Sequence, residues 1–247
     1  MSIENLKKKL NGELPVTREE LKELIKSWGE ISNYDRSIKN KGSCYDLSRL
    51  DVSQITDMSY LFNNSPFDGD IGNWNVSSVT NMLDMFSFAK EFNSPLNDWD
   101  VSKVTSMAGM FYWAENFDSD IGDWDVSKVT EMIYMFFSAK KFNQDISNWD
   151  VSNVTSMKSM FSFTNSFNGD ISNWNTSNVT SMDCLFYFGI AFNSNINKWD
   201  LSNVKSMVAM FSYTKLFNQP LNNWDTSNVT DMKSMFNGAE KFNQVLS

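Results

Sequence analysis

The hydrophobic positions of this chain repeat every 25 residues, and each repeat divides into two patterns. In the first, the non-polar positions follow one another at steps of three, three, one and three residues, which is the spacing of one face of a short helix. A serine just ahead of this run supplies a helix N-cap in every repeat. In the repeat that starts at Ser152, the run comprises Val154, Met157, Met160, Phe161 and Thr164.

The second pattern predicts an extended segment broken by turns. It holds Phe167, Ile171, Trp174 and Thr176, separated by Asn, Asp and Ser residues. If the extended parts of successive repeats pair as strands, equivalent residues lie about 4.8 Å apart. A fixed period of this length is typical of a solenoid. We therefore expect an α/β solenoid of about eight 25-residue coils, each made of a short helix plus a short strand or extended segment.

The large side chains fall into columns that a single repeat could not bury. Tryptophan recurs seven times from Trp74 to Trp224, methionine runs from Met82 to Met232, and two phenylalanine columns run from Phe86 to Phe236 and from Phe92 to Phe242. Each aromatic ring buries on the order of 150–250 Å² when a neighbour covers it. Stacking of successive repeats would supply that cover. An atypical first repeat, in which Leu50 replaces the tryptophan, is expected at the N-terminal end of the array.

The residues ahead of the array predict two helices. Thr17–Glu20 forms a capping box, and the apolar residues after it recur at the i, i+3, i+4, i+7 spacing of an amphipathic helix, with Gly29 as a plausible stop. Residues Ile3–Leu10 suggest a shorter helix. We expect an N-terminal helical cap over residues 1–41 and a solenoid repeat domain over residues 42–247.

Charge and composition narrow the range of functions. The formal net charge is −9, and residues 41–247 hold 13 basic and 23 acidic side chains. This balance argues against nucleic acid as a partner, because phosphate contacts need clustered Lys and Arg. The chain has no histidine, no nucleophile motif and no glycine-rich phosphate loop, so we expect neither an enzyme nor a cofactor or metal site. No apolar stretch is long enough for a transmembrane segment, and Met1–Asn11 is too charged for a signal peptide.

Polar columns and the two cysteines have structural interpretations. The recurring aspartates could in principle hold calcium, but they are expected to be turn and capping groups. The Asn/Asp column that follows the second phenylalanine, from Asn93 to Asn243, is expected to satisfy backbone groups as a ladder. Cys44 and Cys184 lie five or more coils apart, too far for a disulfide, and both are expected to be free thiols.

The most informative positions are those that vary between repeats. Directly after the Met-Phe pair, most repeats carry one or two aromatic residues. Such a row could stack on sugars or anchor a protein partner, or it could pack each ring against its neighbour. Lys90, Glu115 and Lys140 would form part of its polar rim. The candidate stripe comprises Phe88, Tyr112, Trp113, Phe137, Phe163, Tyr187, Phe188 and Tyr213.

The repeat resembles a known family. The segment Phe142–Met157, with its core Trp149-Asp150-Val151-Ser152, followed by Met160-Phe161, is similar to the bacterial surface-protein repeat of mycoplasmal and listerial lipoproteins, grouped with the BspA-like leucine-rich-repeat surface proteins. The resemblance covers Asp46 to Ser247. It implies a leucine-rich-repeat-like solenoid and a cell-surface or secreted location, although the chain as written carries no signal peptide. It supplies no catalytic residues.

These observations lead to two functional expectations. The first is a non-catalytic binding module for protein or glycan recognition and adhesion at a bacterial cell surface. The second is a structural or self-assembling solenoid that stacks through an open C-terminal coil, since the sequence shows no dedicated C-terminal cap.

Overall fold

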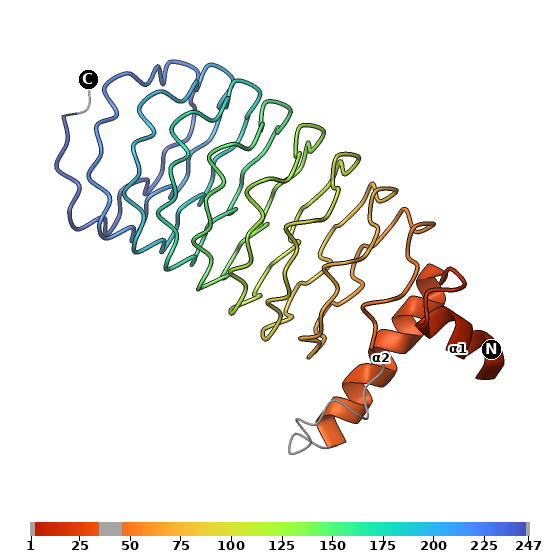
Figure 1. The fold of residues 1–247 in the computed structure, drawn as a ribbon. Helices are drawn as coiled ribbons and strands as arrows, with labels where there is room; N and C mark the ends of the chain where they lie inside the picture. The colour runs from red at the N-terminus through yellow and green to blue at the C-terminus, as the bar shows by residue number, and fades with distance from the viewer. Residues whose placement is uncertain (1–2, 35–45, 246–247) are drawn as a thin grey trace.

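The computed structural model describes residues 3–34 and 46–245, and in these ranges the chain winds into a long stack of coils with two helices at its N-terminal end (Figure 1). The helices are α1 (Ile3–Leu10) and α2 (Arg18–Tyr34). Neighbouring coils are related by single parallel bridges 25 residues apart, such as Ser156 to Ser181 and Ser181 to Ser206. These bridges keep equivalent residues of successive repeats in register.

The predicted helix-plus-strand coil is wrong. Outside α1 and α2, the described residues contain neither a helix nor a strand, so the α/β leucine-rich-repeat-like assignment does not hold. The segment expected to be helical is a succession of tight turns. The amides of Met160, Ser162 and Thr164 donate to carbonyls three residues earlier, at 3.1–3.2 Å, rather than to carbonyls four residues earlier as in an α-helix.

The other amides of the same segment bind the next coil. Met157, Ser159, Phe161 and Phe163 donate to carbonyls of the following coil at 2.7–3.1 Å. The backbone therefore alternates between a bond within the coil and a bond between coils. This alternation requires left-handed residues at two places in each coil, and Ser159 (φ 53°) and Phe163 (φ 57°) occupy them in this repeat. A residue with positive φ at the third position of a four-residue turn is the mark of a type II turn.

The periodicity misled because consecutive turns also bring every third residue to one side. The predicted inward set is indeed buried: Val154, Met157, Met160, Phe161 and Thr164 are each at most 1% exposed. What differs is the backbone beneath them. Burial at a spacing of three residues is common to a helix face and to a run of turns, and only the backbone hydrogen bonds distinguish the two.

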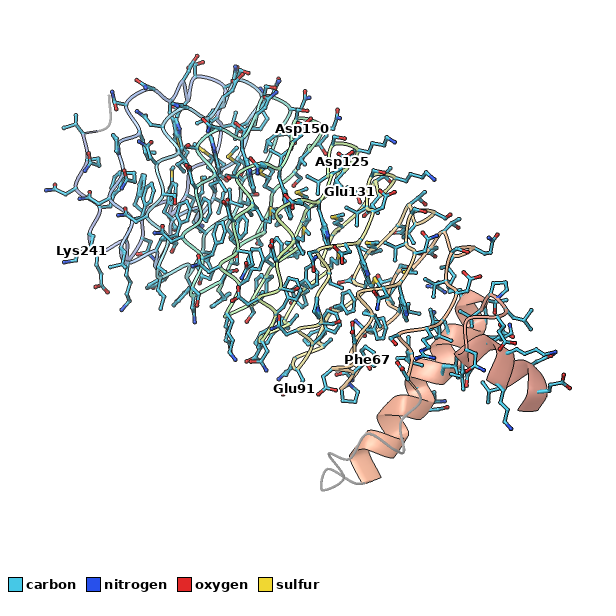
Figure 2. All side chains as sticks on the ribbon, viewed as in Figure 1. Phe67, Glu91, Asp125, Glu131, Asp150 and Lys241 are labelled. Atoms are coloured by element: carbon cyan, nitrogen blue, oxygen red, sulfur yellow. The ribbon has the colours of Figure 1, made fainter. Side chains whose placement is uncertain are left out.

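The predicted helix N-caps are turn residues instead. The amide of Ser152 donates to Oδ1 of Asp150 at 3.0 Å, which closes an Asx turn. The same bond joins Ser127 to Asp125 and Ser102 to Asp100. Figure 2 shows Asp125 and Asp150 on neighbouring coils along one edge of the stack. The aspartates thus act as turn groups, as the sequence predicts.

Aromatic columns fill the interior of the stack. The seven tryptophans lie in one row, and each indole N–H donates to a backbone carbonyl 27 or 28 residues earlier, as Trp174 does to Ile146 at 3.1 Å. Phe161 stacks on Phe136 of the preceding coil at 5.6 Å and on Phe167 of its own coil at 4.2 Å. The expected columns of rings are confirmed, with each coil covering the next.

The N-terminal helices agree closely with the sequence prediction. The capping box is present, because the Thr17 amide donates to Glu20 at 2.9 Å and the Glu20 amide donates to Oγ1 of Thr17 at 3.2 Å. Leu21, Leu24 and Ile25 of α2 are buried in the same core cluster as the first coils. The stop predicted at Gly29 is wrong, since α2 continues to Tyr34.

The last described coil is less covered than the others. Met232 is 44% exposed, whereas its equivalent Met207 in the preceding coil is fully buried. Trp224, Phe236 and Phe242 are partly buried and pack against the core from one side. The C-terminal edge of the described stack therefore presents apolar side chains that every inner coil hides.

Candidate binding groove

The eight aromatic residues of the candidate stripe form one unbroken set of ring contacts. Neighbouring rings are in contact, with centroids 5.3 Å apart for Phe88 and Tyr112 and 4.4 Å apart for Phe188 and Tyr213. Phe88 and Tyr213 are 42% and 37% exposed, and the six others are half-buried. The network combines stacked and edge-on pairs, so the rings pack on one another and still present surface to solvent.

Two backbone positions in each coil generate the stripe. Phe88, Trp113 and Phe163 occupy the left-handed turn position, with φ between 57° and 59°, and so do Phe188 and Tyr213. The position just before it carries either a buried serine, as at Ser87, Ser162 and Ser212, or a half-buried ring. Rings at this preceding position are Tyr112, Phe137 and Tyr187.

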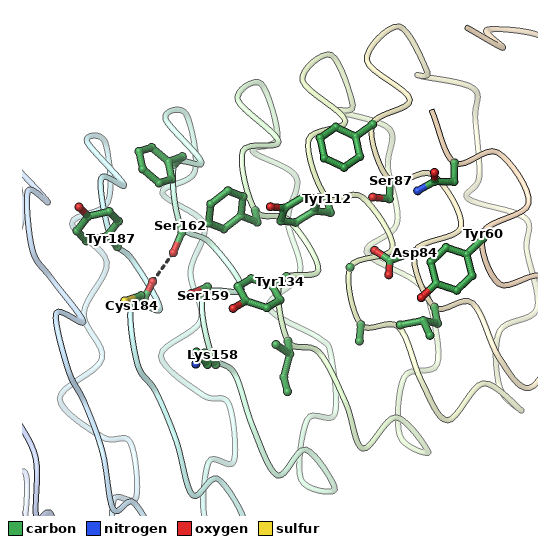
Figure 3. Close-up of a pocket in the computed structure, with 18 residues that line it drawn as sticks. Tyr60, Asp84, Ser87, Tyr112, Tyr134, Lys158, Ser159, Ser162, Cys184 and Tyr187 are labelled. Atoms are coloured by element: carbon green, nitrogen blue, oxygen red, sulfur yellow. Dashed lines mark hydrogen bonds between the residues drawn. The ribbon is translucent and has the colours of Figure 1, made fainter. Parts of the chain in front are cut away.

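A groove of about 830 Å³ runs beside the stripe across six coils (Figure 3). Five stripe residues line it: Phe88, Tyr112, Phe137, Phe163 and Tyr187. The other three, Trp113, Phe188 and Tyr213, do not line the groove but contact rings that do. Small residues such as Ala108, Gly109 and Ser159 form part of the lining, which leaves the space open.

Three polar groups lie at different points along the groove. Asp84 lies at the N-terminal end, where burial raises the pKa of its carboxyl although hydrogen bonds from Tyr60 and Ser87 oppose the shift. Lys158 lies on the fifth of the six coils, and Cys184 lies on the sixth, at the C-terminal end. Burial, followed by the charge of Asp183, raises the pKa of the Cys184 thiol, which keeps it protonated and unreactive at neutral pH.

The most polar part of the rim surrounds Trp113. The ammonium groups of Lys90 and Lys140 lie 6.0 Å and 5.8 Å from the centre of its indole ring. Glu115 bridges the two lysines, with oxygens 3.5 Å from Lys90 and 2.7 Å from Lys140. The hydrogen bond from Lys140 is the main cause that lowers the pKa of Glu115. This part of the predicted polar rim is therefore present and internally paired.

Several lining residues escaped the sequence analysis. Tyr60, Asp84 and Tyr134 face the same groove, and all three occupy the other left-handed position of their coils. Tyr134 contacts Tyr112 at 5.9 Å and Phe137 at 5.8 Å, so it belongs to the same ring network. The signal was available: this position, two residues after the first methionine, varies from Asp to Gly to Tyr between repeats.

A family model matches residues 32–148 and again residues 132–247. Its description reads "Mycoplasma protein of unknown function, DUF285". The chain belongs to the DUF285 family. No curated protein and no solved structure matches the chain. The two matches overlap at residues 132–148, so the groove of this DUF285 chain spans both matched regions, with Tyr134 and Phe137 in the overlap.

The polar columns of the DUF285 repeats serve the backbone. The Asn/Asp ladder is confirmed: Asn143 accepts from the Asn168 amide at 2.9 Å, and the same bond recurs from Asn93 to Asn243. Among the described residues no group of three His, Cys, Asp or Glu side chains could hold a metal ion. Neither α1 nor α2 is long and apolar enough to cross a membrane. Cys44 lies outside the described residues, and Cys184 is a half-buried free thiol.

Proposed function

We propose that this DUF285 chain is a non-catalytic binding module that holds a protein or glycan ligand along the aromatic groove at a bacterial cell surface. The observation that carries the proposal is the continuous ring network from Phe88 to Tyr213, which lies beside a groove crossing six coils. Ligand-binding pockets combine apolar and aromatic lining with a few placed polar groups. Aromatic residues also dominate the energetics of most protein interfaces.

The groove's polar groups support binding rather than catalysis. Cys184 is the only thiol among the described residues, and its raised pKa leaves the thiolate, the nucleophilic form, scarce. Asp84 and Lys158 lie on coils three repeats apart, about 14 Å at the spacing of paired strands, which is too far for an acid and a base to act on one bond. The surface location rests on the resemblance of the repeat to BspA-like surface proteins.

Ligand screening with matched variants tests the proposal. Purified wild-type protein is applied to a glycan array and to a pull-down from host-cell extract, in parallel with Trp113→Ala, Tyr187→Ala and Leu216→Ala. Leu216 is an exposed apolar residue outside the groove lining, so it controls for general loss of surface hydrophobicity. We expect the two stripe variants to lose the ligands that wild type and Leu216→Ala retain. Retention of every ligand by correctly folded Trp113→Ala and Tyr187→Ala would refute the proposal.

A second candidate function is end-to-end self-assembly, which the exposure of the last described coil favours. Met232 is 44% exposed on an edge that also presents part of Trp224 and Phe236. An apolar surface of this kind invites another apolar surface. The apparent molar mass of the wild type in light scattering should then rise with protein concentration, and Met232→Lys should abolish the rise. A monomeric wild type at all concentrations would eliminate this candidate.

A further inference from the structure

The N-terminal end of the groove holds a carboxylate without a cationic partner. Asp84 is half-buried, and in the described part of the chain no lysine or arginine forms an ion pair with it. The rings of Tyr60, Phe88, Tyr112 and Tyr134 line the same stretch of groove. Figure 3 shows Asp84 between Tyr60 on one side and Tyr112 and Tyr134 on the other. We call these five residues the Asp84 pocket.

A glycine in the next coil makes room for this carboxylate. Gly109 is the equivalent of Asp84 in the next coil, and a Cβ atom placed there would overlap Oδ1 of Asp84. Gly109 also has a φ of +61°, which a residue with a side chain adopts only under strain. In other coils this position carries Tyr134, Ser159 or Cys184. The absence of a side chain at residue 109 therefore lets the Asp84 carboxylate lie against the backbone of the next coil.

Such a pocket complements an ammonium group. Aromatic faces attract a cation through their quadrupole, and a carboxylate adds a charge-assisted hydrogen bond. A neutral ligand would bury Asp84 further without compensating its charge, which is unfavourable in a partly desolvated site. Burial already raises the pKa of Asp84, so a cationic ligand would relieve an existing penalty. The net charge of −10 over residues 41–247 also attracts positively charged partners.

The ring lining and the second charged group of the groove favour a lysine side chain over an amino sugar. Lysine carries its charge at the end of a four-carbon stem, which can lie along ring surfaces while the ammonium reaches an inner acceptor. An amine attached directly to a sugar ring has no such stem. The groove also continues from Asp84 for about 14 Å to Lys158, whose ammonium has no ion-pair partner among the described residues. An extended peptide covers that distance in about four residues.

We propose that the Asp84 pocket binds the side-chain ammonium of a lysine on an extended protein segment, and that Lys158 pairs with an acidic residue of the same segment. The inference rests on the proposed binding function of the groove and specifies its ligand. It assigns the two charged groups of the groove to opposite ends of one bound peptide, and so it fixes the direction in which the peptide lies.

The experiment uses an array of nine-residue peptides, each with a central lysine and varied flanks, probed with the labelled full chain. The strongest peptide is then made with norleucine in place of lysine, which keeps the stem and removes the charge. Affinities are measured for wild type, Asp84→Asn and Asp123→Asn. Asp84→Asn keeps a hydrogen-bonding side chain of the same shape. Asp123 is exposed and outside the groove lining, so Asp123→Asn changes the net charge equally and serves as the matched control.

We expect norleucine to weaken binding to wild type at least tenfold, and Asp84→Asn to weaken the lysine peptide by a similar factor without affecting the norleucine peptide. Asp123→Asn should change neither. Equal weakening by Asp84→Asn and Asp123→Asn would attribute binding to overall charge and overturn the inference. An array without lysine-dependent binding would overturn it as well.

A glycan arm distinguishes this inference from the proposed function. Glucosamine oligomers and their N-acetylated forms are tested on the same three proteins. Binding of glucosamine oligomers that depends on Asp84, with no lysine peptide bound, would replace the lysine ligand by an amino sugar. Ligands that require Trp113 and Tyr187 but not Asp84 would refute the lysine site alone and leave the proposed function standing.

Discussion

The guanidinium of Arg18 binds the backbone of Ser59: its Nη2 donates to the Ser59 carbonyl at 2.7 Å and to the hydroxyl at 3.1 Å. Its Nε donates to the Asp57 carbonyl at 2.9 Å. In the next coil, the equivalent carbonyls of Asn81 and Leu83 accept backbone amides of the preceding coil, each at 2.9 Å. One side chain of α2 thus supplies the donors that a preceding coil supplies elsewhere in the stack.

Replacing Arg18 should loosen the first coil. Arg18→Ala removes the donors of the Asp57 and Ser59 carbonyls, and we expect a loss of about 1–3 kcal/mol in the free energy of unfolding. Hydrogen exchange should report the loss at the amides of the first two coils, with protection near Trp174 unchanged, because contacts reach only neighbouring coils. Arg18→Lys keeps the charge without the two-pronged geometry and should recover only part of the loss. Unchanged exchange in the first coil would contradict this role.

Replacing a tryptophan of the row by phenylalanine should lower the free energy of unfolding. Trp174→Phe keeps an aromatic ring but removes one of the two donors of the Ile146 carbonyl, which retains the bond from the Trp149 amide at 3.2 Å. We expect destabilisation of about 1–3 kcal/mol in urea unfolding, from the lost hydrogen bond and the smaller ring. Trp224→Phe, in the partly covered last coil, should lose less because the Trp224 ring is only partly buried. Equal losses at the two positions would argue against this account.

Left-handed positions predict substitutions of opposite sign. Ala209 has a φ of 53°, so Ala209→Gly should stabilise the protein by about 0.5–1 kcal/mol through relief of backbone strain. Gly109→Ala adds a Cβ at φ +61° against the Asp84 carboxylate, and it should destabilise by about 1–3 kcal/mol. Thermal unfolding of both variants tests the pair. The same sign for both changes would contradict the turn geometry described for the coils.

Acid should destabilise the stack through its turn aspartates. Hydrogen bonds from serines lower the pKa values of Asp100, Asp125 and Asp225 below the ordinary value of 3.8. A lowered folded pKa contributes stability above the unfolded pKa, and this stability is lost as the pH falls through the folded values. We expect the urea concentration at the unfolding midpoint to decrease once the pH is below about 4. The double variant Asp100→Asn, Asp125→Asn should flatten that decline, and an equally steep decline would count against it.

Asp84 should show the opposite pH dependence. Because burial raises its folded pKa, its contribution to stability is fully present below the unfolded pKa of about 3.8 and is lost as the pH rises through the folded value. Asp84→Asn should therefore raise the thermal midpoint at neutral pH by a small amount and leave it unchanged at pH 3. Thermal unfolding at both pH values checks this. A lower midpoint at pH 7 would show that the carboxylate stabilises the fold.

Sequence periodicity predicts which residues are buried far better than it predicts the backbone that buries them. The Trp174 row, the Asn168 ladder and the α2 capping box at Thr17 all follow from side-chain chemistry at fixed spacing. The prediction of a helix from Val154 to Thr164 is wrong because a helix face and a run of turns both bury every third residue. The sequence did not indicate the left-handed positions either, since Ser159 and Phe163 are not the glycines that usually mark such positions.

Only part of the groove lining was predicted from the sequence. The sequence places Phe88, Tyr112 and Tyr187 in one stripe because they follow the same Met-Phe pair. It did not include Asp84 and Tyr134, although Asp84 lies four residues before Phe88 and Tyr134 three residues before Phe137, spacings that a helix also brings to one face. Once the coil is known to consist of turns, the two left-handed positions of each repeat lie on one side and form a common surface.

The bonds between coils make the array modular in length. Each coil is held by its two neighbours through the same backbone bonds, so these bonds could form again after loss or duplication of one 25-residue unit. The first coil indicates where smaller changes are absorbed: it has one residue fewer between Phe62 and Phe67 than later coils have, yet these two rings still meet at 4.8 Å. Recombination between repeats could therefore lengthen or shorten the aromatic groove by whole units, and shuffle its variable residues, while the scaffold stays the same.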